Sequence, residues 1–297
     1  MILRLILTDM EKIPEKSLKC GLSIPVFGMG TWMMGGDAKR NENDNGEAAA
    51  AALRCGLERG LRHIDTAEMY AEGFSEEITG RAIAGWARKD IFLTSKVWSS
   101  NLDFDGVLRA AEKSLKRLKT DYLDLYLIHK PNDEFPMSET FRAMNRLADE
   151  KIIKHIGVSN FSVPRLKLAQ SLSERKITVN QIHYNLIYRQ PEADRLVEYA
   201  LDNDIMLIAW RPLQKGAISE AEILKKLAAK YHKTAAQVAL NWVISQPNTV
   251  TLSTMRNPEH IVENIGALDW RLDNDDVEML RRHFPGQKMV SDAVPLL

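Results

Sequence analysis

An eight-stranded α/β barrel is the fold that this sequence of 297 residues predicts. Apolar runs of strand length alternate with amphipathic stretches of helical length along most of the chain, as expected of repeated βα units. Three of these runs end at a titratable residue, namely Asp65, Lys96 and His129. Parallel strands that end in such groups are what a barrel needs to gather an active site at one rim. The sequence therefore favours a (β/α)8 TIM barrel and an enzyme.

Eight strands are expected in chain order, each an apolar run separated from the next by a stretch of helical length. The second, third and fourth of these runs end at the titratable residues named above. The expected strands cover residues 26–30, 61–65, 91–97, 123–129, 155–158, 179–182, 206–210 and 250–252.

Local signals mark several of the helices between these strands. The run Asp44-Asn45-Gly46-Glu47 precedes an alanine-rich stretch, and both Ser162-Val163-Pro164 and Pro191-Glu192 place proline where it suits a first helical turn. The run Leu201-Asp202-Asn203-Asp204 ends a helix before the seventh strand. These signals support the boundaries of the βα units.

One barrel of about 250 residues, with short extensions, accounts for the whole length. We therefore expect residues 1–297 to form a single domain with a short N-terminal extension and a C-terminal tail. A doubly wound dinucleotide-binding fold also alternates strands and helices, but its fingerprint is missing. The run Gly28-Met29-Gly30-Thr31-Trp32-Met33 lacks the third glycine, and no helix opens directly after it. The barrel is the favoured interpretation.

Charge and composition exclude several classes of partner. Forty basic residues balance forty acidic ones, so no overall field attracts nucleic acid or an anionic membrane. The apolar run Met1–Leu7 is short and interrupted by Arg4, unlike a signal peptide, and no run approaches the roughly 20 apolar residues that span a bilayer. The seven histidines and two cysteines lack the spacing of metal ligands, so no metal is expected. A cytoplasmic protein without nucleic-acid or membrane partners is expected.

Several motifs resemble those of the aldo-keto reductase family, in the order and at the barrel-like spacing of that family. They are Asp65-Thr66-Ala67-Glu68-Met69-Tyr70, Leu93-Thr94-Ser95-Lys96, Asp121 to Pro131 with Ile128-His129-Lys130, and Gly157-Val158-Ser159-Asn160-Phe161. The resemblance runs from roughly Leu18 to Leu272. It implies reversible, NAD(P)H-dependent reduction of aldehydes or ketones to alcohols.

The chemistry of carbonyl reduction gives four residues distinct roles. Hydride transfer to carbon leaves negative charge on oxygen, so a proton donor must lie beside that oxygen, and Tyr70 is the candidate acid. The Lys96 ammonium would favour the phenolate and so make the phenol a better donor. Asp65 would be the counter-ion of the buried lysine, and His129 would orient the carbonyl oxygen. The family resemblance implies the same roles for Asp65, Tyr70 and Lys96, and implies that His129 positions substrate or relays a proton.

The resemblance also implies a cofactor pocket. Amide and hydroxyl side chains would bind the nicotinamide carboxamide, Trp210 would stack on the ring in place of the usual tyrosine, and a loop from Arg211 to Gly216 would span the pyrophosphate. Arginine replaces the usual serine at position 211. The implied cofactor-binding residues are Gly30, Thr31, Trp32, Ser159, Asn160, Gln181, Trp210, Arg211, Pro212, Leu213, Lys215, Gly216, Arg256, His260, Glu263 and Asn264.

NADP(H) is the expected cofactor, with NAD(H) left open as a second one. Arg256 is the candidate partner of a 2′-phosphate, which gains charge-assisted hydrogen bonds that a ribose hydroxyl cannot offer. Two departures weaken this preference, because Thr254 stands where many relatives have lysine or glycine and His260 replaces a common arginine.

The substrate pocket is expected to include Trp32, Trp98 and Lys130. Lys130 stands where several relatives place an aromatic residue, so the mouth should be more polar and suit short aldehydes, hydroxylated carbonyls or sugar-like substrates. The tail from Phe284 to Leu297 is expected to close over this pocket.

Two other functions compete with the reductase. A cofactor-bound regulatory or sensory subunit with slow turnover would use the same fold. A barrel hydrolase using Asp65 and His129 ranks last, because the sequence offers neither a metal cluster nor a nucleophile beside a base. Either a monomer or a small homo-oligomer is expected.

Overall fold

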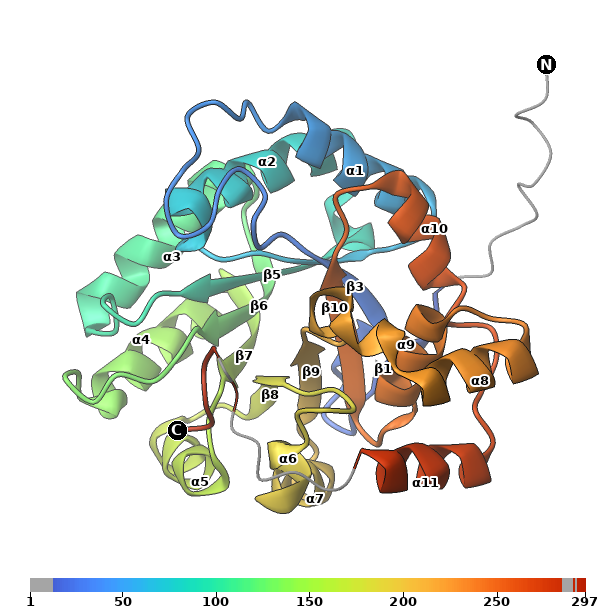
Figure 1. Ribbon diagram of the computed structural model, residues 1–297. Coiled ribbons are helices and arrows are strands. Elements are labelled where there is room, and N and C mark those ends of the chain that lie inside the picture. The colour runs from blue at the N-terminus through green and yellow to red at the C-terminus, as the bar shows by residue number, and fades with distance from the viewer. Residues whose placement is uncertain (1–12, 285–290, 292) are drawn as a thin grey trace.

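The computed structural model describes residues 13–284, 291 and 293–297. Eight parallel strands close into a barrel in which β3 to β9 follow one another and β10 joins β9 to β3. The (β/α)8 TIM barrel is thus confirmed (Figure 1). Every expected strand corresponds to one of these: β3 (Phe27–Gly30), β4 (His63–Asp65), β5 (Phe92–Val97), β6 (Leu123–Ile128), β7 (Ile153–Ser159), β8 (Ile177–His183), β9 (Met206–Trp210) and β10 (Thr249–Thr254).

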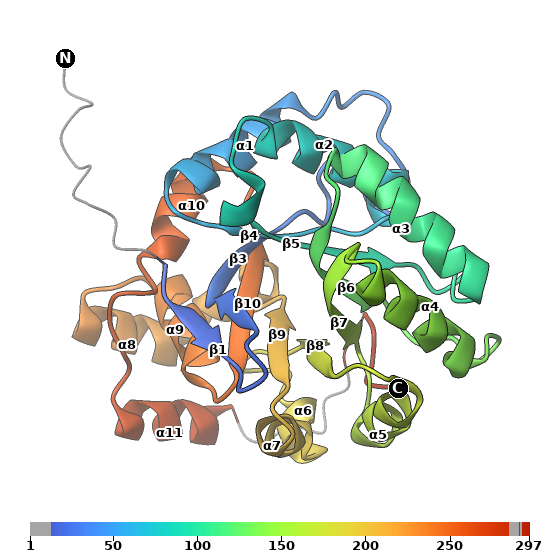
Figure 2. The ribbon, with the colours of Figure 1, turned by 180° about the vertical axis from the view of Figure 1, so that it is seen from behind.

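Helices cover the outside of the barrel (Figures 1 and 2). Ser162 is the N-cap residue of α5, with Pro164 in the first turn as expected, and α1 begins at Glu47 directly after Gly46. Among the described residues no helix is long and apolar enough to cross a bilayer. The helices are α1 (Glu47–Glu58), α2 (Phe74–Ile83), α3 (Phe104–Leu118), α4 (Met137–Asp149), α5 (Val163–Leu172), α6 (Gln190–Ala193), α7 (Leu196–Asp202), α8 (Glu222–Tyr231), α9 (Ala235–Ser245), α10 (Pro258–Ile265) and α11 (Asn274–His283), with 3-10 turns η1 (Tyr70–Gly73), η2 (Arg88–Asp90) and η3 (Gln214–Glu220).

A separate apolar cluster fills the inside of the barrel, and it includes Leu125 and Leu127 of β6 and Val179 of β8. Side chains alternate between the two faces of a strand, so residues two positions further along face the same way. This alternation places His129 and Gln181 on the interior side, one step beyond the apolar cluster. The barrel interior is therefore apolar in its middle and toward the amino ends of the strands, and polar at their carboxyl ends.

An antiparallel hairpin of β1 (Glu15–Ser17) and β2 (Ser23–Pro25) lies against the other end of the barrel, where the sequence predicted only a short extension (Figure 2). Strands of three residues are too short to stand out as a periodic pattern. The apolar side chains of this hairpin segment join the interior cluster, so the hairpin closes that end of the barrel. They are Leu18, Leu22 and Ile24. The N-terminal run 1–7 considered above lies outside the described residues.

Lys16 anchors this hairpin. Its ammonium donates to the carbonyl oxygens of Ile244, Gln246 and Thr249 at 2.6, 2.7 and 2.8 Å. Burial, together with the charge of Arg271, lowers the pKa of Lys16 to about 8. The three carbonyl groups use every donor of the ammonium, so the charge is solvated by the backbone that leads into β10.

His63 lies in the barrel interior, fully buried beneath Asp65 of the same strand. Its Nε2 is 3.3 Å from Thr94 Oγ1, and a Cβ added at Gly28 would lie 2.6 Å from its Nδ1. Glycine at position 28 thus makes room for the imidazole. Burial lowers the pKa of His63 to about 4, against the attraction of Asp65, so the ring is neutral in the folded protein at neutral pH.

We expect His63 to make stability fall in mild acid. The unfolded state takes up the proton near pH 6.5 and the folded state only near pH 4, so stability is lost as pH falls through this interval. The difference between these two pKa values corresponds to about 3 kcal/mol of folding free energy. Urea unfolding between pH 7 and 4.5 should therefore show a smaller loss for His63→Asn than for the wild type. Parallel pH dependences in the two proteins would contradict this account.

Candidate active site

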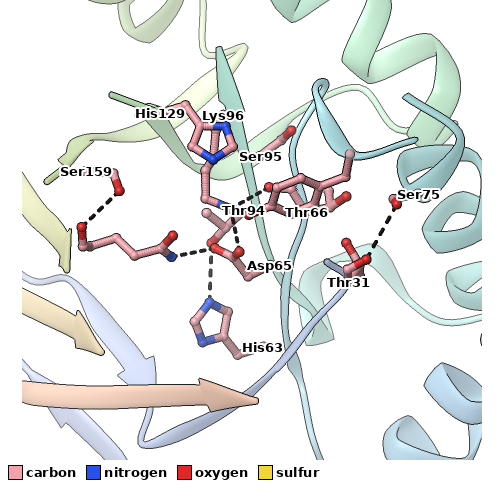
Figure 3. Close-up of polar contacts among 12 residues, drawn as sticks. Thr31, His63, Asp65, Thr66, Ser75, Thr94, Ser95, Lys96, His129 and Ser159 are labelled. Carbon is pink, nitrogen blue, oxygen red and sulfur yellow. Dashed lines mark hydrogen bonds and ion pairs between the residues drawn. The ribbon is translucent and has the colours of Figure 1, made fainter. Parts of the chain in front are cut away.

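A buried ion pair lies at the carboxyl ends of β4 and β5. Lys96 Nζ donates to Asp65 Oδ1 at 2.5 Å and to the carbonyl oxygen of Thr66 at 2.8 Å (Figure 3). It also donates to the hydroxyl of Tyr70 at 3.2 Å. Lys96 is 0% exposed and Asp65 is 2% exposed. All three ammonium donors are used, as a buried lysine requires if it is to stay charged.

The protonation states of this group follow from burial and pairing. Burial acts to lower the pKa of Lys96, but Asp65 and Tyr70 outweigh it and the net pKa is raised, so the ammonium persists. Burial raises the pKa of Tyr70, and this outweighs the opposite effect of Lys96. The effect expected of the lysine, which favours the phenolate, is present but smaller than that of burial. Tyr70 is thus a protonated phenol at neutral pH.

His129 follows β6 and lies beside this phenol. Its ring is 5.4 Å from that of Tyr70 and 5.0 Å from that of Trp98, edge to face in both cases. Burial, then the charges of Lys96 and Lys130, holds the pKa of His129 well below its usual range. Its Nδ1 is buried with no hydrogen-bond partner in the described part of the chain. The imidazole is therefore neutral.

The next strands add an amide and hydroxyl cluster to the ion pair. Gln181 Nε2 donates to Asp65 Oδ2 at 2.7 Å, so both carboxylate oxygens are engaged. The Ser159 hydroxyl donates to the backbone carbonyl oxygen of Gln181 at 2.9 Å, and Asn160 Nδ2 donates to Ser159 Oγ at 2.9 Å. Asn160 Oδ1 accepts from Trp210 Nε1 at 3.3 Å. Four of the expected cofactor residues are thus linked to Asp65 through hydrogen bonds.

His183 is a part of the site that the sequence analysis missed. Its ring stacks between those of Tyr188 and Trp210, with centroids 4.2 and 4.3 Å away. Its nitrogens are hydrogen-bonded to Ser291 Oγ at 2.8 Å and Gln214 Oε1 at 3.1 Å. The available signal was its position two residues after Gln181 on a strand, which places both side chains on the same face.

The loop after β9 has an unusual backbone. Arg211, Gln214 and Lys215 have φ of 54°, 47° and 56°, and Gly216 follows with φ of 91°. Left-handed conformations at non-glycine residues cost free energy and cluster at ligand-binding loops. Asn185 Nδ2 donates to the Arg211 carbonyl oxygen at 2.9 Å. This segment, which includes Pro212 and Leu213, therefore has a strained backbone beside Trp210.

The last four of the expected cofactor-binding residues, Arg256, His260, Glu263 and Asn264, lie where β10 meets α10. Thr254 pairs with Gly30 at the barrel rim, and Arg256 and His260 are exposed just beyond it. Asn264 is buried and Glu263 is half-buried on α10. Asp65, Tyr70, Lys96 and His129 are called the tetrad below. No hydrogen bond or ion pair among the described residues joins the group at β10 and α10 to the tetrad. The structure therefore places them in a separate patch on the rim.

Three residues expected in the substrate pocket surround the tetrad. The Trp32 ring lies 5.0 Å from that of Tyr70, and Lys130 Nζ lies 4.9 Å from the centroid of the Trp98 ring. Thr31, which precedes Trp32, is fully buried, and its Oγ1 has no partner in the described part of the chain. No cluster of three or more potential metal ligands occurs among the residues that the structure describes.

The end of the C-terminal tail reaches this same rim. Leu297 donates its backbone N–H to the carbonyl oxygen of Asn160 at 3.0 Å and accepts from the N–H of Ser162 at 2.7 Å. Residues 285–290 and 292 of the tail lie outside the described residues, so closure over the pocket stays a prediction.

The chain is similar to known proteins over most of its length. The model of the Aldo/keto reductase family matches residues 26–284. The chain belongs to the aldo/keto reductase family. It is 36% identical to the glyoxal reductase of Bacillus subtilis (strain 168) over 88% of this chain and 89% of that protein. It is 35% identical to a methylglyoxal reductase of Escherichia coli (strain K12) over 90% of this chain and 93% of that protein.

Solved structures of other aldo/keto reductases have the same fold. A thermostable aldo-keto reductase in complex with the inhibitor epalrestat has a TM-score of 0.88 and 38% identity, covering 91% of this chain and 99% of that one. An aldo/keto reductase from Klebsiella pneumoniae in complex with NADP and acetate has a TM-score of 0.85 and 32% identity. The match covers 97% of this chain and 100% of that one.

We expect removal of the lysine alone to destabilise this aldo/keto reductase strongly. Lys96→Met leaves the Asp65 carboxylate buried without its counter-ion, which costs about 3–5 kcal/mol. The double variant Asp65→Asn/Lys96→Met removes both charges and should recover a measurable part of this loss. Urea or thermal unfolding of the wild type, Lys96→Met, Asp65→Asn and the double variant at pH 7 measures the difference. A double variant as unstable as the sum of two single losses would refute the pairing argument.

Proposed function

We propose that this aldo/keto reductase reduces aldehydes or ketones to alcohols with hydride from a nicotinamide cofactor, NADPH in preference to NADH, and that Tyr70 is the general acid. The observation that carries the proposal is a protonated phenol bonded to the Lys96 ammonium and flanked by a neutral imidazole. The similarity of the chain to a glyoxal reductase and a methylglyoxal reductase, and to the Klebsiella structure that contains NADP, supports it.

The residues present suit a nicotinamide. No hydrogen bond from a described residue reaches Gln181 Oε1, so this acceptor can bind a carboxamide N–H, while the Gln181 amide nitrogen holds Asp65. Trp210 offers an indole that His183 and Asn160 hold in one orientation. When bound here, the cofactor supplies the hydride.

The tetrad then handles the charge and the proton. The carbonyl oxygen accepts hydrogen bonds from the Tyr70 hydroxyl and from the neutral His129. As a C–H bond forms at the carbonyl carbon, the π electron pair moves to oxygen, which takes the Tyr70 proton. The Lys96 ammonium stabilises the phenolate that remains, and Asp65 keeps the ammonium in place. The same steps in reverse oxidise an alcohol.

We expect Tyr70→Phe to lose about 100-fold or more in kcat, because general acid catalysis contributes about that much. The variant keeps the ring and its contacts, so its Kd for NADPH, measured by fluorescence titration, should stay close to that of the wild type. Turnover is followed as loss of NADPH absorbance with methylglyoxal. Unchanged turnover in the variant would remove Tyr70 from the chemistry.

The wild type in the same assay decides between the reductase and the regulatory alternative. Tight NADPH binding with negligible turnover of every aldehyde and ketone in a broad panel would favour the regulatory subunit. No observation on the described residues favours that alternative at present.

We expect Arg256→Ala to raise the KM for NADPH about tenfold or more and to leave the KM for NADH nearly unchanged, because only NADPH carries a 2′-phosphate. Arg109→Ala is the matched control, since Arg109 is an exposed arginine on α3. Steady-state kinetics with both cofactors measure the effect. Equal changes for NADPH and NADH would defeat the assignment.

A further inference from the structure

Lys130 places a second lysine beside the tetrad. It directly follows His129 at the end of β6 and is half-buried, with its Nζ 4.9 Å from the centroid of the Trp98 ring. The Trp98 ring in turn lies 5.0 Å from the His129 ring. The charge of Lys130 also helps to lower the pKa of His129, so its field reaches the imidazole. This ammonium belongs to the mouth of the site and not to a distant surface.

No described carboxylate neutralises Lys130. It forms no ion pair or hydrogen bond with any residue in the described ranges, in contrast to Lys96, which Asp65 neutralises. The acidic residues of the surrounding loops have other partners. Asp133 pairs with Arg165 at 2.7 Å, and Glu68 accepts from the Trp98 backbone N–H at 2.6 Å. The indole of Trp98 attracts the ammonium through its ring but adds no negative charge.

The other groups at the mouth are donors. Tyr70 is protonated, and His129 is neutral with its Nδ1 buried, so its hydrogen-bonding capacity toward the pocket is at Nε2. A carbonyl oxygen satisfies these two donors but leaves the Lys130 ammonium without an anion. A substrate that brings a carboxylate as well as a carbonyl would gain a charge-assisted hydrogen bond.

We propose that Lys130 makes the mouth of this site a subsite for the carboxylate of oxo acids, so that carbonyl substrates with a nearby carboxylate are preferred over their neutral counterparts. The inference rests on the proposed carbonyl reduction and names its substrate class. Lys130 acts in specificity and takes no part in hydride or proton transfer. Carbonyl substrates without a carboxylate use the same tetrad but make no contact with the Lys130 ammonium.

Two matched pairs of aldehydes test the inference. They are 4-oxobutanoate with its methyl ester, and 4-carboxybenzaldehyde with methyl 4-formylbenzoate. The ratio of kcat/KM for the acid to kcat/KM for the ester is measured for the wild type, Lys130→Met and Lys130→Arg. We expect Lys130→Met to lower this ratio about tenfold or more in at least one pair, mainly through KM, and Lys130→Arg to retain most of it. The wild-type ratio should also fall with added salt.

Lys89→Met is the matched control, because Lys89 is exposed on η2, before the start of β5. The ratio of kcat/KM for acid and ester in Lys89→Met should equal that of the wild type. Acid and ester affected equally by Lys130→Met, or a wild type that reduces the esters better than both acids, would overturn the subsite. Turnover of the esters by every variant tests the proposed function separately, since failure to reduce any aldehyde would refute the reductase and not merely the carboxylate subsite.

Discussion

The buried pair of Asp65 and Lys96 is the interaction on which the rest of the site depends. Removing two charges from water is costly, and the cost is met only when each charge has a full set of partners. Here the ammonium has three acceptors, and the carboxylate has Lys96 on one oxygen and Gln181 on the other. These bonds tie β4, β5, β8 and η1 together at one point of the rim.

The same burial sets the protonation of the neighbouring groups. It raises the pKa of Tyr70 and lowers that of His129, so both side chains are neutral although a full positive charge lies within reach of the phenol. A neutral donor pair beside a charge that is already paired undergoes little rearrangement when negative charge develops on a substrate oxygen. This is the preorganisation that electrostatic catalysis requires.

The sequence could predict the barrel and its polar rim, because the strands are apolar runs and the tetrad residues lie at the ends of these runs or shortly after them. Short or long-range features could not be predicted in the same way. The hairpin strands have three residues each, too few for a pattern, and the bond between Gln181 and Asp65 joins residues 116 positions apart. The direction of the Tyr70 pKa depends on how burial compares with one charge, which only the three-dimensional arrangement reveals.

The hairpin at the amino ends of the strands restricts how substrate can enter and product can leave. Leu18, Leu22 and Ile24 continue the interior apolar cluster, and Lys16 fastens their segment to the backbone before β10. The interior is therefore packed with side chains at the amino ends of the strands, and no route to Tyr70 leads through it. Substrate must arrive from the side of the carboxyl ends, and product must depart on that same side. Each product molecule must leave before the next substrate can approach Tyr70.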